Sequence, residues 1–132
     1  MMMAKVRGKN TKPELIVRKA LHAAGFRFRL HRRELPGTPD LVLPGLRTVV
    51  FVHGCFWHGH DCRKGRTRPV SNTAFWNTKL DRNRERDIEA VTALKRQGWH
   101  VEIVWECEVT SGIPDLLDRL TLRRMARSDR SS

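Results

Sequence analysis

Residues 39–53 have the sequence PDLVLPGLRTVVFVH, which contains two apolar runs separated by a turn at Pro44-Gly45. The first run opens with Asp40, and the second is almost continuously apolar and ends at His53. An apolar run without alternation is typical of a central strand that is covered on both faces. The segment therefore predicts a β-hairpin, in which Asp40 lies beside the backbone of Val52 and His53.

The segments around this hairpin also show helix and strand patterns. Thr11-Lys12-Pro13-Glu14 is a capping box, which predicts the start of a helix that ends before Gly25. We expect, in order, a helix at 11–24, strands at 26–31, 40–43 and 48–53, a helix at 73–97, a strand at 99–105, and a helix that begins at Pro114 and ends before residue 128. This order predicts an α/β fold with a mixed sheet flanked by helices.

Two of these helices carry side chains whose direction matters. Glu14 falls at the edge of the core-facing stripe of the first helix, so it is either only a cap or a carboxylate directed over the sheet toward a site. On the second helix, the charged stretch 79–89 is interpreted as a solvated face. The residues of that helix expected to point inward are Phe75, Leu80, Ile88, Val91 and Leu94.

Length and charge restrict the class of protein. The chain has 132 residues and a formal net charge of +12, which fits one small domain with a polyanionic partner, most simply nucleic acid. We expect a basic arm at 1–10, a single domain at 11–127 and a polar tail at 128–132. No apolar run is long enough to span a membrane, and the start lacks the pattern of a secretory signal, so the cytoplasm is expected. Expected phosphate contacts are Lys5, Arg7, Lys9, Arg63, Lys64, Arg66 and Arg68.

Histidines and cysteines are concentrated in residues 53–62, HGCFWHGHDC, and a third cysteine, Cys107, directly follows the last expected strand. Three thiolates and one imidazole match the ligand types and number of a closed, structural Zn²⁺ site. Spacing alone does not choose between His58 and His60 as the fourth ligand. The alternative is a set of isolated thiols with surface histidines.

The expected hairpin also predicts a second metal site. A carboxylate beside a backbone carbonyl offers the hard oxygen ligands that Mg²⁺ prefers. Neighbouring histidines could then transfer protons to or from water and the leaving oxygen. Together these groups are the equipment of metal-assisted phosphodiester hydrolysis.

Four segments carry a family resemblance: LPGTPD at 35–40, VFVHGCFWH at 50–58, FW at 75–76 and VWEC at 104–107. They resemble the very short patch repair (Vsr) endonucleases, which belong to the restriction-endonuclease-like PD-(D/E)xK superfamily. The resemblance implies Mg²⁺-dependent nicking of double-stranded DNA on the 5′ side of the thymine in a T·G mismatch, the product of 5-methylcytosine deamination. It also implies a bacterial enzyme with a functional link to a cytosine-5 DNA methyltransferase and other repair proteins. Because a single-strand nick needs one active site, a monomer is expected.

The resemblance further implies roles for individual residues. Mg²⁺ would be bound by the carboxylate of Asp40 and the backbone carbonyl of Val52, where the family commonly has Thr. His58 would be the general base or acid, His53 would contact the scissile phosphate or leaving group, and Glu14 would reach the waters around the metal. The implied Zn²⁺ ligands are Cys55, His60, Cys62 and Cys107, and the implied DNA-unstacking wedge is Phe56, Trp57 and Trp76.

The chain departs from the superfamily at one point. Where the second strand normally has an acid, one residue and a lysine, this chain has Phe51, Val52 and His53. Two other functions therefore stay open: a site-specific restriction or nicking enzyme that acts on intact duplex, and a zinc-stabilised DNA-binding module without catalysis.

Overall fold

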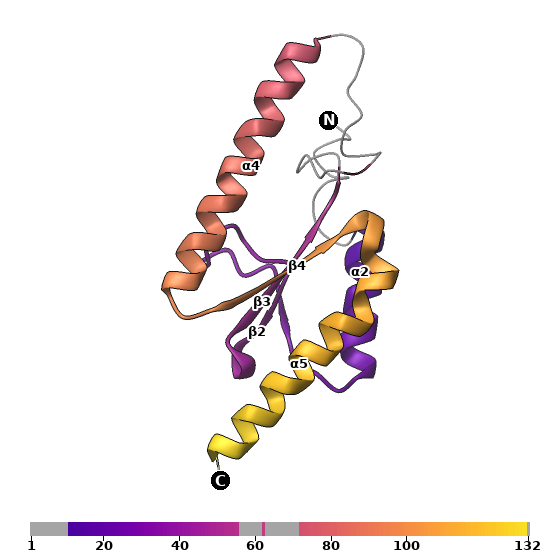
Figure 1. Ribbon diagram of the computed structural model, residues 1–132, viewed down its shortest axis with the longest axis vertical. Helices are drawn as coiled ribbons and strands as arrows, with labels where there is room; N and C mark the ends of the chain where they lie inside the picture. The colour runs from indigo at the N-terminus through magenta and orange to yellow at the C-terminus, as the bar shows by residue number, and fades with distance from the viewer. Residues whose placement is uncertain (1–10, 56–61, 63–71, 132) are drawn as a thin grey trace.

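The computed structural model describes residues 11–55, 62 and 72–131, with side chains up to residue 127. Figure 1 shows the order of the elements. They are α2 (Lys12–Ala23), β1 (Arg29–Leu30), β2 (Leu41–Leu43), the 3₁₀ turn η1 (Pro44–Leu46), β3 (Thr48–His53), α4 (Thr73–Arg96), β4 (His100–Trp105), the 3₁₀ turn η2 (Glu106–Glu108) and α5 (Val109–Ser131). No helix among the described residues is both long enough and apolar enough to cross a membrane.

The described strands form one mixed sheet in the order β1-β2-β3-β4. β1 pairs with β2 and β2 with β3 in antiparallel fashion, and Leu41 lies opposite Val50. β4 runs parallel to β3, with Val52 opposite Val104, so the chain between them crosses over through α4. The α/β class, the mixed sheet and the β2–β3 hairpin predicted from the sequence are therefore confirmed.

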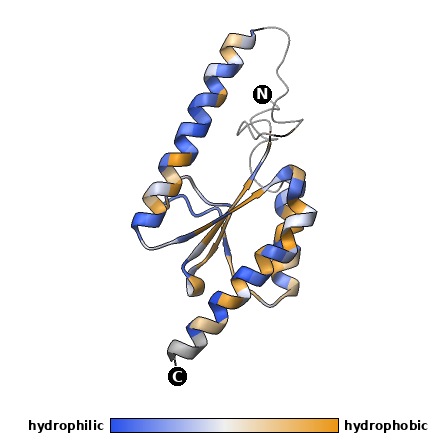
Figure 2. Cartoon of the chain, in the orientation of Figure 1, coloured by the Kyte–Doolittle hydropathy of each residue, from blue (hydrophilic) through white to orange (hydrophobic). Residues whose placement is uncertain are grey.

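Helices cover both faces of the sheet. In Figure 1, α4 lies on one side of the strands, and α2 and α5 lie together on the other. The two core clusters follow the two-residue period of the strands. Val50 packs with Leu21 of α2 and Leu120 of α5, whereas Phe51 packs with Leu94 of α4. Figure 2 shows the apolar side of α2 and α5 turned toward the strands.

The capping box positions the start of α2. Thr11 is the N-cap, and its Oγ1 accepts a hydrogen bond from the backbone N–H of Glu14 at 3.4 Å. At the other end Gly25 takes the left-handed conformation, with φ +82°, and turns the chain toward β1. These are the start and end that the sequence predicts, and they place Glu14 in the first turn.

The predicted strand 26–31 is wrong in its length. Only Arg29–Leu30 pairs as β1, opposite Val42 and Leu41 of β2. Phe26 is still 5% exposed and belongs to the core, so the alternation in the sequence marks burial more widely than it marks strand pairing.

The predicted limits of the last helix are also wrong. α5 begins at Val109 and contains Pro114, and it continues through the polar residues to Ser131. Val109 is 9% exposed and belongs to the core cluster that covers α2 and α5. Its packing accompanies a helix that begins upstream of the proline, although Pro114 is the sixth residue of α5 and has no N–H to donate to the carbonyl of Thr110.

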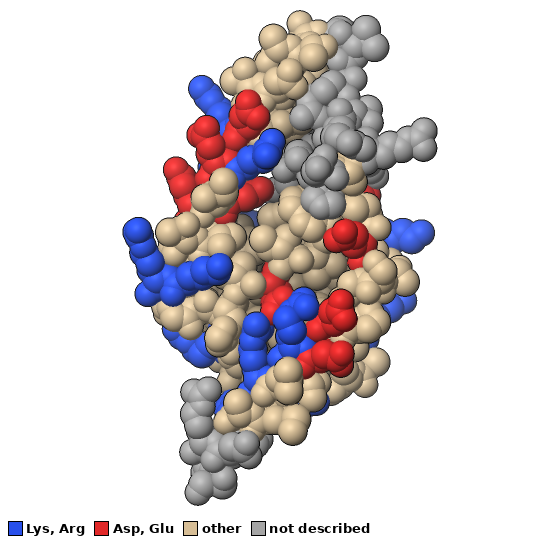
Figure 3. All heavy atoms as spheres, viewed as in Figure 1, with Lys and Arg blue, Asp and Glu red and all other residues tan. Residues whose placement is uncertain are grey.

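The prediction for α4 is partly wrong. Leu80 and Leu94 are fully buried, but Phe75 is 59% and Ile88 66% exposed. In Figure 1 the N-terminal half of α4 extends beyond the strands, so Phe75, which lies in that half, has no sheet to pack against. Ile88 lies in the other half, on a different side of the helix from the buried Leu80 and Leu94. Figure 3 shows acidic and basic side chains interspersed over α4, as expected for a solvated face.

Candidate active site

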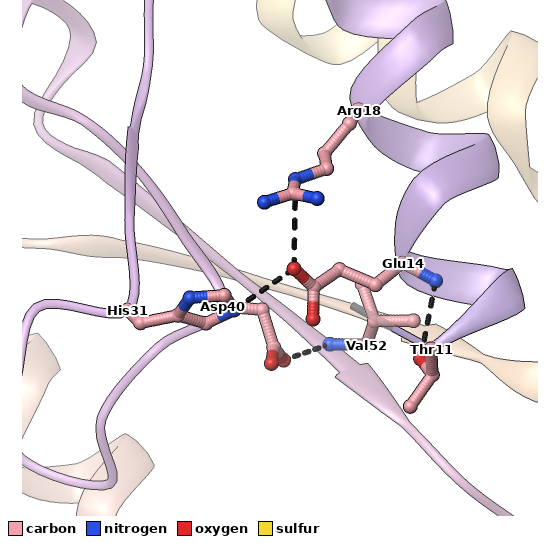
Figure 4. A network of polar contacts seen from close by, with 6 residues as sticks. All are labelled: Thr11, Glu14, Arg18, His31, Asp40 and Val52. Carbon is pink, nitrogen blue, oxygen red and sulfur yellow. Dashed lines mark hydrogen bonds and ion pairs between the residues drawn. The ribbon is translucent and has the colours of Figure 1, made fainter. Parts of the chain in front are cut away.

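Glu14 is a buried acid at the end of the sheet. Its residue exposure is 1%. Its Oε2 lies 2.8 Å from Nε2 of His31 and 3.6 Å from Nε of Arg18, which is one turn further along α2. A buried carboxylate requires such partners because an isolated charge is costly to remove from water. Glu14 is thus more than a helix cap, and its carboxylate points toward the strands (Figure 4).

Asp40 lies directly before β2 and reaches across to β3. Its Oδ2 accepts a hydrogen bond from the backbone N–H of Val52 at 2.7 Å (Figure 4). The hairpin register brings residue 40 to the last residues of β3, so the expected approach of Asp40 to the backbone of Val52 is confirmed. The contact is made by the N–H, and binding of a metal by the Val52 carbonyl remains a prediction.

His31 is a site residue that the sequence reasoning missed. It follows β1 in the left-handed conformation, with φ +48°, and its N–H donates to the backbone oxygen of Asp40 at 3.1 Å. Its imidazole turns toward Glu14 (Figure 4). The signal that could have found it is the pairing of β1 with β2, since Leu30 opposite Leu41 places His31 beside Asp40.

Glu14, His31 and Asp40 come from three different elements and form one group of potential ligands. One donor atom from each lies within 4.8 Å of the other two. The two carboxylates are hard oxygen ligands that suit a divalent cation with part of its shell left to water or phosphate. These residues therefore fit a catalytic Mg²⁺ site. The imidazole of His31 is the member of the group that the sequence did not predict.

His53 directly follows Val52, the backbone partner of Asp40, but its ring lies on the face of the sheet that α4 covers. It is 5% exposed, and its ring centroid is 5.4 Å from that of Phe51 and 5.1 Å from that of Trp105. Val52, one residue earlier, packs with the α2 and α5 cluster. The contact of His53 with the scissile phosphate remains a prediction. From this face the side chain would have to make that contact beyond the end of β3.

The three cysteines meet at the ends of the parallel strands. Cys55 follows β3, Cys107 lies in η2 after β4, and the sulfurs of these two residues and Cys62 all lie within 4.8 Å of one another. The backbone N–H of Cys107 donates to Sγ of Cys55 at 3.3 Å. Sulfurs that share a tetrahedral Zn²⁺ at about 2.3 Å lie roughly 3.8 Å apart. The three sulfurs lie close enough together to share one metal ion, so the cysteines are not isolated from one another, and Zn²⁺ binding remains a prediction.

The pKa values of these thiols are shifted by their surroundings. Burial raises the pKa of Cys55, and burial together with the neighbouring sulfurs raises the pKa of Cys107 to about 12. Without a metal the thiols of Cys55 and Cys107 are therefore protonated at neutral pH. Because a metal binds the thiolate, loading of the cluster must release protons.

Comparisons with known proteins agree on one family. The family described as "DNA mismatch endonuclease Vsr" matches residues 1–64. The type II nicking enzyme V.XorIIP of Xanthomonas oryzae pv. oryzae is 54% identical over 109 residues, which cover 83% of this chain and 79% of that protein. The DNA mismatch endonuclease Vsr of Escherichia coli is 37% identical over 123 residues, which cover 93% of this chain and 78% of that protein.

The chain belongs to the Vsr family. A further relative, the type II nicking enzyme V.NmeAIP of Neisseria meningitidis, is 51% identical over 108 residues, 82% of this chain and 76% of that protein. The Vsr family consists of DNA endonucleases, which makes the group of Glu14, His31 and Asp40 the candidate centre for hydrolysis. The family resemblance read from the sequence is confirmed.

Several residues predicted from charge or from the Vsr resemblance lie outside the described part of the chain. They are Lys5, Arg7, Lys9, Phe56, Trp57, His58, His60, Arg63, Lys64, Arg66 and Arg68. Trp76 is described: it lies in the first turn of α4, half-buried, with its ring 5.5 Å from that of Phe75. Its neighbour Phe75 is largely exposed, so the start of α4 presents an aromatic pair.

Proposed function

We propose that this protein nicks one strand of a DNA duplex on the 5′ side of the thymine in a T·G mismatch, by Mg²⁺-dependent phosphodiester hydrolysis. The observation that carries the proposal is the convergence of the Glu14 and Asp40 carboxylates at the end of β3, in a chain of the Vsr family. A module that only binds DNA has no need of two acids at one point, where they repel both each other and the phosphate backbone.

Each part of the site has a proposed role. Asp40 and the carbonyl of Val52 hold Mg²⁺, and Glu14 reaches the water around it. When bound, the cation stabilises the charge that develops on the phosphate. His58 transfers the proton at the attacking water, and His53 contacts the scissile phosphate or the leaving group. The hydrogen bond from Val52 holds Asp40 in place for this task.

The remaining residues would hold the loop and the DNA. Cys55, Cys62 and Cys107 bind Zn²⁺ together with His60, which joins the loop after β3 to the end of β4. Phe56, Trp57 and Trp76 form an aromatic wedge, and the exposure of neighbouring Phe75 supports a DNA-facing position for the start of α4. The basic residues of the arm and loop contact phosphates. A single-strand nick needs one active site, so the enzyme acts as a monomer.

The test is nicking of a labelled T·G duplex and of its T·A counterpart, with and without Mg²⁺. We expect a nick 5′ of the mismatched thymine, at least a hundredfold faster than cleavage of the T·A duplex, and no nick by Asp40→Ala. Asp118→Ala, which removes an exposed acid on α5, is the matched control and should nick as the wild type does. Tight mismatch binding without a nick under any divalent ion would contradict the proposal and favour a DNA-binding module.

A second candidate has its own support. Two relatives that are more than half identical to this chain carry the description type II nicking enzyme. The second candidate is therefore a nicking enzyme that recognises a sequence in intact duplex. Equal nicking of the T·G and T·A duplexes would favour it, and a panel of T·G duplexes with varied flanks would show which sequence is recognised. A functional link to a cytosine-5 DNA methyltransferase is compatible with both candidates.

A further inference from the structure

The imidazole of His31 is aimed at one oxygen of Glu14. Nε2 of His31 lies 2.8 Å from Oε2 of Glu14, and the same oxygen is 3.6 Å from Nε of Arg18. An ionised carboxylate only accepts hydrogen bonds, so with Glu14 ionised the proton of this contact lies on Nε2 of His31. The hydrogen bond with His31 and the ion pair with Arg18 reach the same oxygen from different directions, so turning the carboxylate would break both contacts (Figure 4).

The backbone around His31 is arranged to make this contact. A residue other than glycine is uncommon at a φ of +48°, and His31 adopts it directly after β1. Its backbone N–H donates a hydrogen bond to the backbone carbonyl oxygen of Asp40, so the histidine is also held beside the second acid of the site. Its side chain is only 12% exposed, which limits its movement further. Strained backbone of this kind is concentrated at functional sites.

We infer that His31 is a positioning residue of the active site: its Nε2–H fixes the carboxylate of Glu14 beside Asp40. The inference rests on the proposed function, in which Glu14 reaches the water around the metal. His31 then acts only through Glu14. The alternative, in which His31 is itself a metal ligand through Nε2, requires the opposite tautomer, because an Nε2 that donates to Glu14 has no lone pair for a metal.

A double-mutant cycle separates these roles. Single-turnover nicking at saturating Mg²⁺ is measured for the wild type, His31→Ala, Glu14→Gln and the double variant. We expect His31→Ala to slow the wild type about 10- to 100-fold and to slow Glu14→Gln by less than about threefold, because coupled residues are non-additive. His31→Gln should recover to within about fivefold of the wild type, since its amide can donate the same bond. His22→Ala, on the exposed distal end of α2, is the matched control.

Metal binding gives a readout besides activity. Mn²⁺ affinity, followed by electron paramagnetic resonance, should change less than about threefold in His31→Ala and fall sharply in Asp40→Ala. An Mn²⁺ affinity lost equally in both variants would make His31 a ligand and overturn the inference. Full additivity in the cycle, or an unchanged rate in His31→Ala, would overturn it as well. Should His31→Ala fail to fold, the cycle is run with His31→Phe, which keeps the ring volume but cannot donate.

Failure of the proposed function can be recognised separately. If the wild type nicks no duplex, that function is wrong, and the contact is then tested by ¹⁵N nuclear magnetic resonance of the His31 ring. A protonated Nε2 whose resonance shifts on Glu14→Gln supports the contact. An unchanged resonance contradicts it.

Discussion

Glu14 and Asp40, the two acids of the candidate active site, should make the metal-free protein less stable than a variant that lacks one of them. The oxygens of Glu14 and Asp40 lie within 4.8 Å of each other in a partly buried place. For two unit charges at that separation, Coulomb's law with an effective dielectric constant of about 20 gives a repulsion of roughly 3.5 kcal/mol. Asp40→Asn removes this repulsion and keeps a side-chain oxygen that can accept from Val52.

Two effects reduce the gain. Arg18 and His31 already offset part of the charge of Glu14, and a neutral amide accepts the Val52 hydrogen bond more weakly by about 1 kcal/mol. We therefore expect Asp40→Asn to raise the free energy of unfolding by about 1 to 2 kcal/mol, which corresponds to about 3 to 6 °C in Tm for a chain of this length. Such a gain on loss of activity is the usual trade-off at a functional site.

The assay is thermal unfolding followed by circular dichroism, first without added divalent ions and then with Mg²⁺. Mg²⁺ at ten times its dissociation constant should stabilise the wild type by about 1.4 kcal/mol and should leave Asp40→Asn nearly unchanged. Asp118→Asn is the control, because that acid is exposed on α5. The reasoning is refuted if Asp40→Asn melts below the wild type without Mg²⁺, or if Mg²⁺ stabilises both proteins equally.

Three further predictions concern stability elsewhere in the fold. Gly37→Ala should lower the free energy of unfolding, measured by chemical denaturation, by about 1 to 3 kcal/mol, because φ is +74° there and the new Cβ would lie 2.7 Å from that of Ala90. The control is Gly112→Ala in α5, whose new Cβ meets nothing within 4 Å and which should be neutral or stabilising. In the metal-free, reduced protein the pKa of Cys107 is raised, so as the pH rises the unfolded chain loses the thiol proton before the folded protein does. The stability that this thiol contributes is therefore present below about pH 8.5 and is lost as the pH rises toward 12. Cys107→Ser or added Zn²⁺ should flatten this decline of stability with pH in urea titrations, and an equally steep decline in Cys107→Ser would contradict the assignment. Glu102→Gln should lower the free energy of unfolding, measured by thermal denaturation, by about 1 to 2 kcal/mol, because Glu102 is only 6% exposed and pairs with Arg119 and Arg123 of α5 at 2.9 and 2.8 Å. An unchanged stability would show that the ion pairs only compensate the burial of the charge.

Local patterns predicted the parts of the fold that depend on neighbouring residues. The hairpin follows from two apolar runs and a turn, and the start of α2 follows from a capping box whose Thr11 bond is present. The elements that were wrong depend on packing: β1 pairs with β2 over only two residues, and the start of α5 at Val109 belongs to the core. Ile88 lies on a different side of α4 from the buried Leu80 and Leu94, so it stays exposed.

The candidate site divides in the same way. Asp40 and the cysteines could be proposed from the sequence because each lies beside a strand whose end can be predicted, and the Vsr resemblance singles out the same residues. His31 could not, because it carries no motif and enters the site only through the pairing of β1 with β2 and an unusual φ. Side-chain direction decided the position of His53, whose ring lies on the α4 face, opposite to Val52.

By itself, the sequence determined the α/β class, the hairpin that carries Asp40, the family and the residues with the chemistry to bind metals. These are encoded in runs and motifs of a few residues, where local propensity and hydrophobic patterning act. Only the tertiary structure decided which of the two interpretations of Glu14 applies and which histidine meets it. That pairing joins residues 17 positions apart, from a helix and a strand end, and it exists only once α2 has packed on the sheet and buried the carboxylate.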